Sequence, residues 1–149
     1  MSLEIRQLKS LDGLSNCLNT LSDLPRDYRA ESLIGHLRQN DWLWGIFASQ
    51  TFGGFSLYRP IFDEVELLYF YILPSFRHHG YGAELLKGSM QLLKELDMKR
   101  VFLEVSEVNH SALKLYTNGG FKRVGIRERY YSDGSSAIVM SRGLEDIAD

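Results

Sequence analysis

The chain has 149 residues, of which 44% are hydrophobic and 24% are charged, and its formal net charge is −2 at pH 7. A chain of this length can form one domain with a sizeable hydrophobic core. Its composition is typical of a soluble globular protein and excludes a largely disordered chain. The near-neutral charge also argues against a dedicated nucleic-acid-binding domain, because such domains usually carry a marked excess of basic residues.

The sequence contains no pattern typical of a membrane span or an export signal. The longest apolar run, Leu67 to Leu73, is too short to cross a bilayer, and the polar start at Met1 to Glu4 is unlike a signal peptide. The single cysteine, Cys17, lies in a leucine-rich pattern, so we interpret it as a packing residue in a reducing compartment. We therefore expect a cytoplasmic protein with no membrane or nucleic-acid partner, either a monomer or a homodimer.

In chain order, the N-terminal half begins with a strand pattern over residues 3–8. Leucines at helical spacing then predict a helix through Leu21 and, after Pro25, a second helix through Leu37. The strands expected next cover residues 42–48, 54–58 and 65–73. The first two of these strands should be joined as a hairpin near Gly53-Gly54.

The C-terminal half predicts two more helices and three more strands. The expected elements are a helix over residues 80–96, a strand over 100–105, a helix over 109–118 and strands over 121–131 and 136–140. The shorter helix should end at Gly119-Gly120, and the last two strands should pair across Ser132-Asp133-Gly134. The element order is then β-α-α-β-β-β-α-β-α-β-β. The long helix should join two parallel neighbouring strands, in a mixed α/β sheet of about seven strands with about four helices on its two faces.

A basic, glycine-rich loop joins the most apolar strand to the long helix. Its sequence is Arg77-His78-His79-Gly80-Tyr81-Gly82. The first N–H groups of a helix have no partner within it and lie at its positive end, so this junction is a candidate anion site. The two glycines permit close approach, and the arginine and histidines add donors. The loop taken alone is also compatible with an ordinary tight turn, and the two histidines lack the further ligands that a metal site needs.

A second group of polar residues follows the long helix. Glu104 interrupts an otherwise apolar strand, where a carboxylate is costly unless it is paired or solvated. Asn109 is well placed to cap the next helix, and Tyr116 follows two turns later. The carboxylate and the phenol could flank one cleft. Taken in isolation, they are more typical of a salt-bridge partner and a core aromatic.

Together the two groups resemble the GNAT family of acetyl-CoA-dependent N-acetyltransferases. The loop matches the pattern Arg/Gln-x-x-Gly-x-Gly/Ala of that family. Further motifs look like its RimI-type branch, the ribosomal-protein alanine N-acetyltransferases: Leu103-Glu104-Val105, Asn109, Ala112, Leu115-Tyr116, Gly119-Gly120-Phe121, Arg127 to Tyr131, Asp133-Gly134, Ala137-Ile138 and Met140. The specific motifs cover roughly residues 64–142, and residues 1–63 resemble the family only in element order.

The resemblance implies that residues 1–149 form one GNAT domain that transfers an acetyl group from acetyl-CoA to a primary amine, foremost a protein N-terminal α-amine. It implies that Glu104 is the general base and Tyr116 the general acid for the departing CoA thiolate, without a metal. The residues that it implies for acetyl-CoA binding are Phe70, Ile72, Leu73, Arg77, His78, His79, Gly80, Tyr81, Gly82, Ala83 and Asn109.

Several alternatives stay open at this point. Glu66, on the strand before the loop, is a rival base and a candidate acceptor-site residue. Tyr130 and Tyr131 line a peptide groove or only stiffen the last hairpin. The bulky Tyr69 and Tyr71 depart from the small or polar residues common in the family, which puts the ribosomal substrate in doubt. The acceptor could instead be a lysine or a small-molecule amine, and the domain could be a catalytically silent acyl-CoA-binding module.

Overall fold

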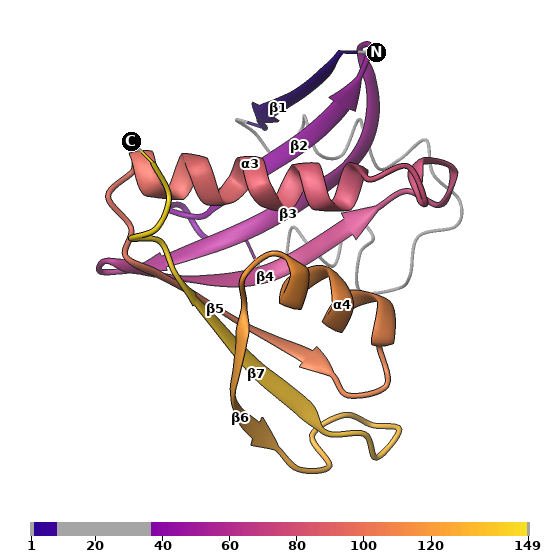
Figure 1. Ribbon diagram of the computed structural model, residues 1–149, viewed down its shortest axis with the longest axis vertical. Coiled ribbons are helices and arrows are strands. Elements are labelled where there is room, and N and C mark those ends of the chain that lie inside the picture. Colours follow the sequence, from indigo (N-terminus) through magenta and orange to yellow (C-terminus); the bar gives the residue numbers. More distant parts are fainter. Residues whose placement is uncertain (1, 9–36, 149) are drawn as a thin grey trace.

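The computed structural model describes residues 2–8 and 37–148, which form a seven-stranded mixed sheet with two α-helices (Figure 1). The strands are β1 (Leu3–Gln7), β2 (Trp42–Ala48), β3 (Thr51–Ile61), β4 (Glu64–Ile72), β5 (Arg100–Ser106), β6 (Lys122–Arg127) and β7 (Ala137–Gly143). Their spatial order is β1-β2-β3-β4-β5-β7-β6. The two helices predicted between residues 11 and 37, together with Cys17 and Pro25, lie outside the described residues.

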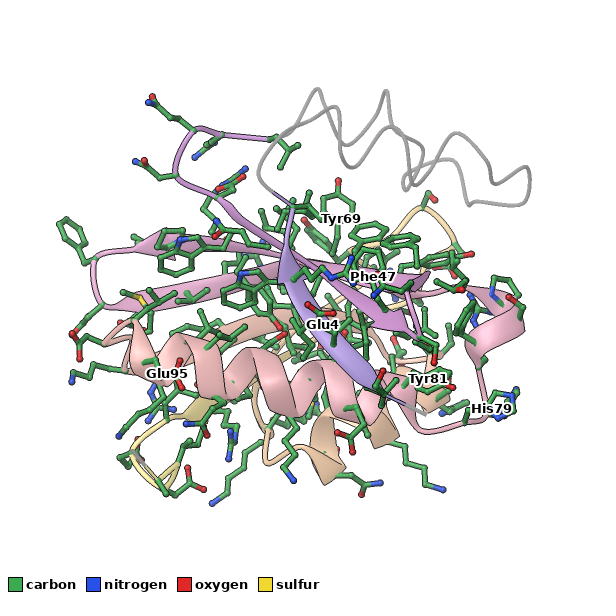
Figure 2. All side chains as sticks on the ribbon, turned by 90° about the horizontal axis from the view of Figure 1, so that it is seen from above. Glu4, Phe47, Tyr69, His79, Tyr81 and Glu95 are labelled. Atoms are coloured by element: carbon green, nitrogen blue, oxygen red, sulfur yellow. The ribbon has the colours of Figure 1, made fainter. Side chains whose placement is uncertain are left out.

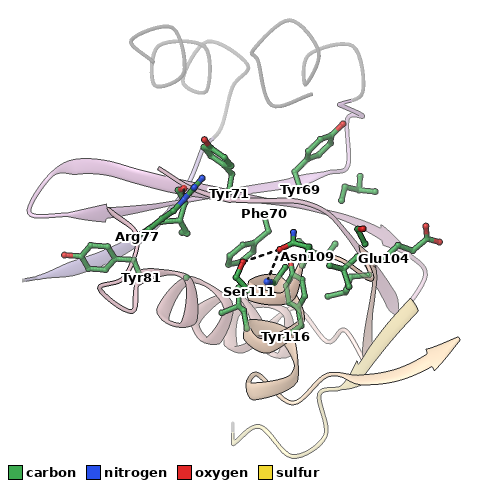
Figure 3. Close-up of a pocket in the computed structure, with 18 of the residues that line it drawn as sticks. Tyr69, Phe70, Tyr71, Arg77, Tyr81, Glu104, Asn109, Ser111 and Tyr116 are labelled. Carbon is green, nitrogen blue, oxygen red and sulfur yellow. Dashed lines mark hydrogen bonds between the residues drawn. The ribbon is translucent and has the colours of Figure 1, made fainter. Parts of the chain in front are cut away.

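The described helices are α3 (Tyr81–Glu95) and α4 (His110–Asn118), and a 3₁₀ turn at Pro74–Phe76 precedes α3. Both helices lie on the same side of the sheet (Figure 3), and α3 packs against β2, β3 and β4. Leucines along α3 place Leu85, Leu86 and Leu93 in the core, as the amphipathic pattern predicts. No helix in the described part of the chain is long and apolar enough to span a membrane.

The pairing of β4 with β5 is parallel, as expected for strands joined by a helix. The other neighbouring pairs are antiparallel, which confirms the mixed sheet. The last strand, β7, runs between β5 and β6 and pairs with both. This insertion brings β6 to one edge of the sheet, while β1 forms the other edge.

The turn of the β2–β3 hairpin lies at Ser49-Gln50, so the prediction of a turn near Gly53-Gly54 is wrong. Ser49 and Gln50 both have positive φ, 48° and 76°. Gly53 instead lies at a bulge within β3. A Cβ at Gly54 would collide with the Tyr71 carbonyl oxygen, so this glycine allows β3 and β4 to approach closely.

The final hairpin is also shorter than predicted on one side. β6 ends at Arg127 rather than at residue 131. Two residues later the chain takes a left-handed conformation at Arg129, where φ is 52°. Tyr130 and Tyr131 therefore belong to the loop between β6 and β7 and not to a strand.

The two faces of the sheet carry separate hydrophobic clusters. The cluster beneath α3 and α4 includes Trp44, Tyr58, Leu103 and Tyr116. The second cluster, which includes Phe55 and Leu57, forms on the opposite face. Because side chains alternate along a strand, neighbouring residues such as Leu57 and Tyr58 contribute to different clusters.

Candidate active site

A cleft opens where β4 and β5 diverge. The two strands pair only through Glu64–Glu66 and Arg100–Phe102. Beyond these residues no ladder joins them, and a cleft of about 690 Å³ lies between β4, β5 and the starts of α3 and α4. Figure 3 shows the residues that line the cleft.

Most of the predicted site residues meet in this cleft although they come from several segments that are distant in the sequence, including the start of α3. The predicted residues that line it are Phe70, Ile72, Arg77, His78, Gly80, Tyr81, Gly82, Glu104, Asn109, Tyr116 and Tyr131. They come from β4, the loop before α3, the start of α3, β5, α4 and the β6–β7 loop. The tertiary fold thus joins the two polar groups of the sequence into one site.

The loop before α3 has the local geometry of an anion site. Gly80 is the N-cap of α3, has a φ of 81° and offers no side-chain cap, so the first N–H groups of α3 donate no hydrogen bond to a capping side chain. His78 also has a positive φ, 65°. A Cβ at Gly80 would meet nothing within 4 Å. Glycine is therefore favoured at this position by the backbone conformation and not by a lack of space.

Arg77 fastens this loop to β4. Its Nε donates a 2.8 Å hydrogen bond to the Ile72 carbonyl oxygen, and its guanidinium carbon lies 5.2 Å from the centre of the Tyr71 ring. The sequence predicted Arg77 as a donor to an anion, whereas one of its donors here holds the loop in place. Tyr81, the first residue of α3, packs against the rings of Phe76 and His79.

Glu104 lies on one wall of the cleft and is partly exposed. It sits on β5, with 26% of its side chain exposed. Its Oε1 forms an ion pair with the Arg127 Nε at 3.0 Å. The sequence left two interpretations of Glu104 open, and both are correct: it is a salt-bridge partner, and its carboxylate lines the cleft. The sequence assigned no site role to Arg127, because Arg127 on β6 reaches Glu104 only through the pairing of β6 and β5 with the same strand, β7.

Tyr116 lies on another wall, on α4, and only 8% of it is exposed. Its ring makes edge contacts with Phe70 and Phe121, at centroid distances of 6.0 and 5.8 Å. It is thus a core aromatic that also lines the cleft. At the start of α4, Asn109 accepts from the Ala112 N–H at 3.2 Å and from the Ser111 hydroxyl at 3.3 Å, which confirms the predicted N-cap (Figure 3).

Five predicted residues do not line the cleft. Leu73 is buried in the core cluster of the opposite face, Ala83 lines a separate hollow between α3 and α4, and Glu66 lines a neighbouring groove. His79 and Tyr130 are largely exposed. The period of side-chain alternation explains Leu73, since it lies one residue beyond Ile72 and points to the other face.

The structure adds residues that sequence reasoning missed as site residues. Ser106, at the end of β5, and Ser111, in the first turn of α4, both line the cleft. Tyr69 and Tyr71 also line it but lie on the other side of the sheet from Phe70 (Figure 3). Figure 2 likewise places Tyr69 on the face opposite α3. Regular alternation along β4 separates Phe70 from these two tyrosines. A bulge at Leu68 in the β3–β4 pairing, which gave no signal in the sequence, places them on the face opposite Leu67.

Tyr131 extends the cleft from the β6–β7 loop. Partial burial raises the pKa of its phenol, and the negative charge of Glu104 and the neighbouring Tyr130 add to the rise. Its backbone closes a tight loop, in which the Tyr131 N–H donates to the Ser135 carbonyl at 3.1 Å. Tyr130 packs on Tyr131 edge to face but does not line the cleft.

Comparison with known proteins decides the family. Residues 10–121 match the family model described as the acetyltransferase (GNAT) family. The chain belongs to the GNAT family. This confirms the resemblance predicted from the loop and the downstream motifs.

Individual GNAT proteins show how far the similarity extends. The [ribosomal protein bS18]-alanine N-acetyltransferase of Haemophilus influenzae is 38% identical over 92 residues, which cover 59% of this chain and 62% of that protein. The chain spans about half the length of several other curated relatives. These names confirm the predicted similarity to the RimI-type branch.

Solved structures show the same GNAT fold. The crystal structure of the ribosomal-protein-S18-alanine N-acetyltransferase from Escherichia coli has a TM-score of 0.81 at 21% identity and covers 99% of this chain and 100% of its own. The PaiA N-acetyltransferase from Thermoplasma acidophilum, solved in complex with coenzyme A, has a TM-score of 0.73 at 22% identity, covering 96% and 99% of the two chains.

Proposed function

We propose that this protein transfers the acetyl group of acetyl-CoA to the N-terminal α-amine of a polypeptide. The observation that carries the proposal is the divergence of β4 and β5 directly beside the start of α3, with Glu104 and Tyr116 on separate walls of the opening. Membership of the GNAT family supports acetyl transfer. The names of the relatives, which are N-alpha- and ribosomal-protein alanine N-acetyltransferases, support an N-terminal acceptor.

The cleft has the features that an acyl-CoA thioester requires. Residues 77–82 and the first turn of α3 present backbone N–H groups to a pyrophosphate. Beyond Glu66 the edge of β4 that faces β5 has no ladder partner, so its backbone groups are available to the amides of a pantetheine arm. A backbone N–H near Ile72 would stabilise the negative charge that develops on the thioester oxygen.

The reaction then proceeds by direct attack. The neutral amine nitrogen forms a bond to the thioester carbonyl carbon, and the C–S bond breaks. Glu104 accepts the proton lost by the amine, through a water, and Tyr116 donates its phenolic proton to the CoA thiolate. An α-amine with a pKa of about 7.7–8.0 is partly neutral near pH 7.5. A lysine amine, with a pKa of about 10.4, is almost fully protonated at that pH, so the base must remove one more proton before the attack.

Much of the rate enhancement in this scheme comes from holding two reactants together. Effective molarities of about 10⁵ M or more are typical of well-oriented reactions, and general acid and base groups add about 10²–10⁴-fold. Glu66 is the alternative base, since it lies in a groove that Glu104 also lines.

A thiol-release assay with acetyl-CoA tests this proposal. The acceptors are peptides with free Ala, Ser or Met at the N-terminus, the same peptides with blocked termini, an N-blocked lysine peptide and a polyamine. Release that requires a free N-terminus is the expected result. Release only with the lysine peptide or the polyamine would overturn the N-terminal acceptor, and binding of CoA without release on any amine would indicate a silent acyl-CoA-binding module.

A further inference from the structure

A second groove lies beside the cleft and shares a wall with it. It has a volume of about 470 Å³ and is formed by the β3–β4 hairpin, the middle of β5, and one residue each from β6 and β7. Leu103 and Glu104 line both the groove and the cleft. A polypeptide whose N-terminal amine lies at Glu104 therefore has a continuous surface on which its next residues can bind.

The charge of this groove is strongly negative. Its described lining contains four carboxylates, Asp63, Glu64, Glu66 and Glu104, and one guanidinium, that of Arg127. Arg127 is paired with Glu104. Neither Glu64 nor Glu66, both of them exposed, forms an ion pair with any residue that the structure describes. Glu66 lies within electrostatic reach of Arg59, its cross-strand neighbour on β3. Glu64 is therefore the carboxylate more open to a cation that enters from the solvent.

Large apolar side chains lie next to these carboxylates. Phe62, at the tip of the β3–β4 hairpin, is 96% exposed, and its neighbour Ile61 is 53% exposed. Phe102, half-buried on β5, alternates with the buried Val101 and Leu103 and so lies on the same side of the strand as Glu104. Adjacent exposed apolar side chains of this size are a feature of binding surfaces.

A lysine or arginine side chain combines the two properties that the groove offers. Its alkyl stem packs on apolar surface, and its cationic head pairs with carboxylates and lies favourably over aromatic rings. We propose that this groove, which we call the acidic groove, binds a Lys or Arg side chain located within the first few residues after the reacting amine of the acceptor polypeptide. This inference rests on the proposed function and specifies the class of polypeptide that the site selects.

The test is a set of acceptor peptides with a common free N-terminus. Each of positions 2, 3 and 4 carries Lys, Gln or Glu in turn, and kcat/KM is measured at low and at high salt. We expect Lys at one position to exceed Gln by about two- to tenfold, as befits partly exposed ion pairs, and Glu to be the poorest. The ratio should fall towards one in high salt, because screening weakens exposed charge pairs.

Variants of the groove locate the preference. Glu64→Gln removes one carboxylate, and Phe62→Asn removes the exposed ring while keeping a residue type that tolerates its positive φ of 59°. Each variant should reduce the ratio of kcat/KM for the Lys peptide to kcat/KM for the Gln peptide. The matched control is Glu4→Gln, on the edge strand β1, which β2 and β3 separate from β4 (Figure 2); it should leave the ratio at its wild-type value.

The outcomes separate the two proposals. Equal kcat/KM for the Lys, Gln and Glu peptides, a preference for Glu, or an unchanged ratio in both groove variants would overturn the acidic groove while leaving N-terminal acetyl transfer intact. Failure of every free-N-terminus peptide to react would overturn the proposed function, and the groove assignment with it.

Discussion

Tyr116 combines a packing role with a place in the cleft, and these two roles can be separated experimentally. Its ring contacts Phe70 and Phe121, whereas its phenolic oxygen is the atom that the proposed mechanism requires. Removal of the oxygen alone preserves the ring contacts. The same distinction applies to Glu104, whose carboxylate has both a structural partner and a proposed chemical role.

For Tyr116→Phe we expect turnover to fall by about 10²-fold or more, because a general acid is lost. Stability should change by no more than about 1 kcal/mol, since one hydrogen-bonding group is removed and the packing is kept. Steady-state kinetics and urea unfolding measure the two effects. Wild-type turnover in this variant would exclude a general-acid role for Tyr116.

For Glu104→Gln we expect reduced turnover and a lower pKa for Tyr131. Burial is the main cause of the raised pKa of Tyr131, and the charge of Glu104 is the next. Loss of that negative charge makes the phenolate less costly, so the pKa should move down towards 10.0. NMR titration of labelled tyrosines, assigned with Tyr131→Phe, gives the shift, and an unchanged pKa would contradict this electrostatic coupling.

Tyr58 presents a different case, because its hydroxyl is fully buried. Burial raises its pKa to about 12, and the nearby Ser89 and Ser56 hydroxyls only partly oppose the rise. Within the described residues the hydroxyl has no hydrogen-bond partner of normal geometry. Tyr58→Phe should therefore be neutral or stabilising, by up to about 1 kcal/mol. Tyr58→Leu, which also removes ring contacts, should destabilise clearly in the same urea unfolding experiment.

At the scale of elements, the β5–α4 loop and the β6–β7 loop are bonded to each other at the mouth of the cleft. The Glu107 N–H donates to the Ser136 carbonyl at 2.9 Å, and the Glu107 carboxylate accepts from the Ser136 N–H. The Ser106 and Ser135 hydroxyls lie 3.0 Å apart and share a hydrogen bond. These contacts connect the loop that carries Asn109 to the loop that carries Tyr131.

The contact between these loops should depend on pH. The hydrogen bonds from Ser136, foremost the one from its backbone N–H, lower the pKa of Glu107 below its ordinary value of 4.5. A lowered folded-state pKa contributes stability above the ordinary value, and that contribution is lost as the pH falls through the folded-state pKa.

We therefore expect Glu107→Gln to reduce the hydrogen-exchange protection of the Ser136 amide at neutral pH. The difference from wild type should vanish in acid. Glu128→Gln, in the β6–β7 segment but without such a bond in the described part of the chain, is the control. Equal protection in wild type and Glu107→Gln at neutral pH would show that the carboxylate does not hold the loops together.

At the scale of the whole molecule, bound CoA should contact both halves of the sheet and thereby stabilise the folded protein. β4 and β5 share a ladder over only three residue pairs, so a ligand in the cleft would add contacts between strands whose backbones are not paired there. A ligand that binds only the folded state adds about 2.7 kcal/mol of stability at 100 times its Kd.

We expect CoA to raise the melting temperature in a concentration-dependent way and to protect the amides of residues 77–82 from exchange. Gly80→Ala should weaken both effects, because alanine is strained at a φ of 81°. Thermal unfolding and hydrogen exchange with and without CoA give the result. An unchanged melting temperature at saturating CoA would contradict binding in the cleft.

Local patterns in the sequence determined much of this protein. Alternation and helical spacing predicted all seven described strands and both described helices, and the parallel pairing of β4 with β5 followed from their helical connection. Gly80, Asn109 and the basic loop were identified from residue type and spacing alone. These features depend on interactions within a few residues, which a linear sequence displays directly.

Only the tertiary structure decided the features that depend on distant segments. The pairing of both β5 and β6 with β7 brings Arg127 to Glu104, and the β4–β5 ladder ends after only three residue pairs. A bulge in the β3–β4 pairing places Tyr69 and Tyr71 on the face opposite Leu67, although unbroken alternation would put all three on one face. Strand order and register arise from packing of the whole sheet. A shift of one residue in the register moves every side chain of a strand to the other face, so no local pattern could specify these features.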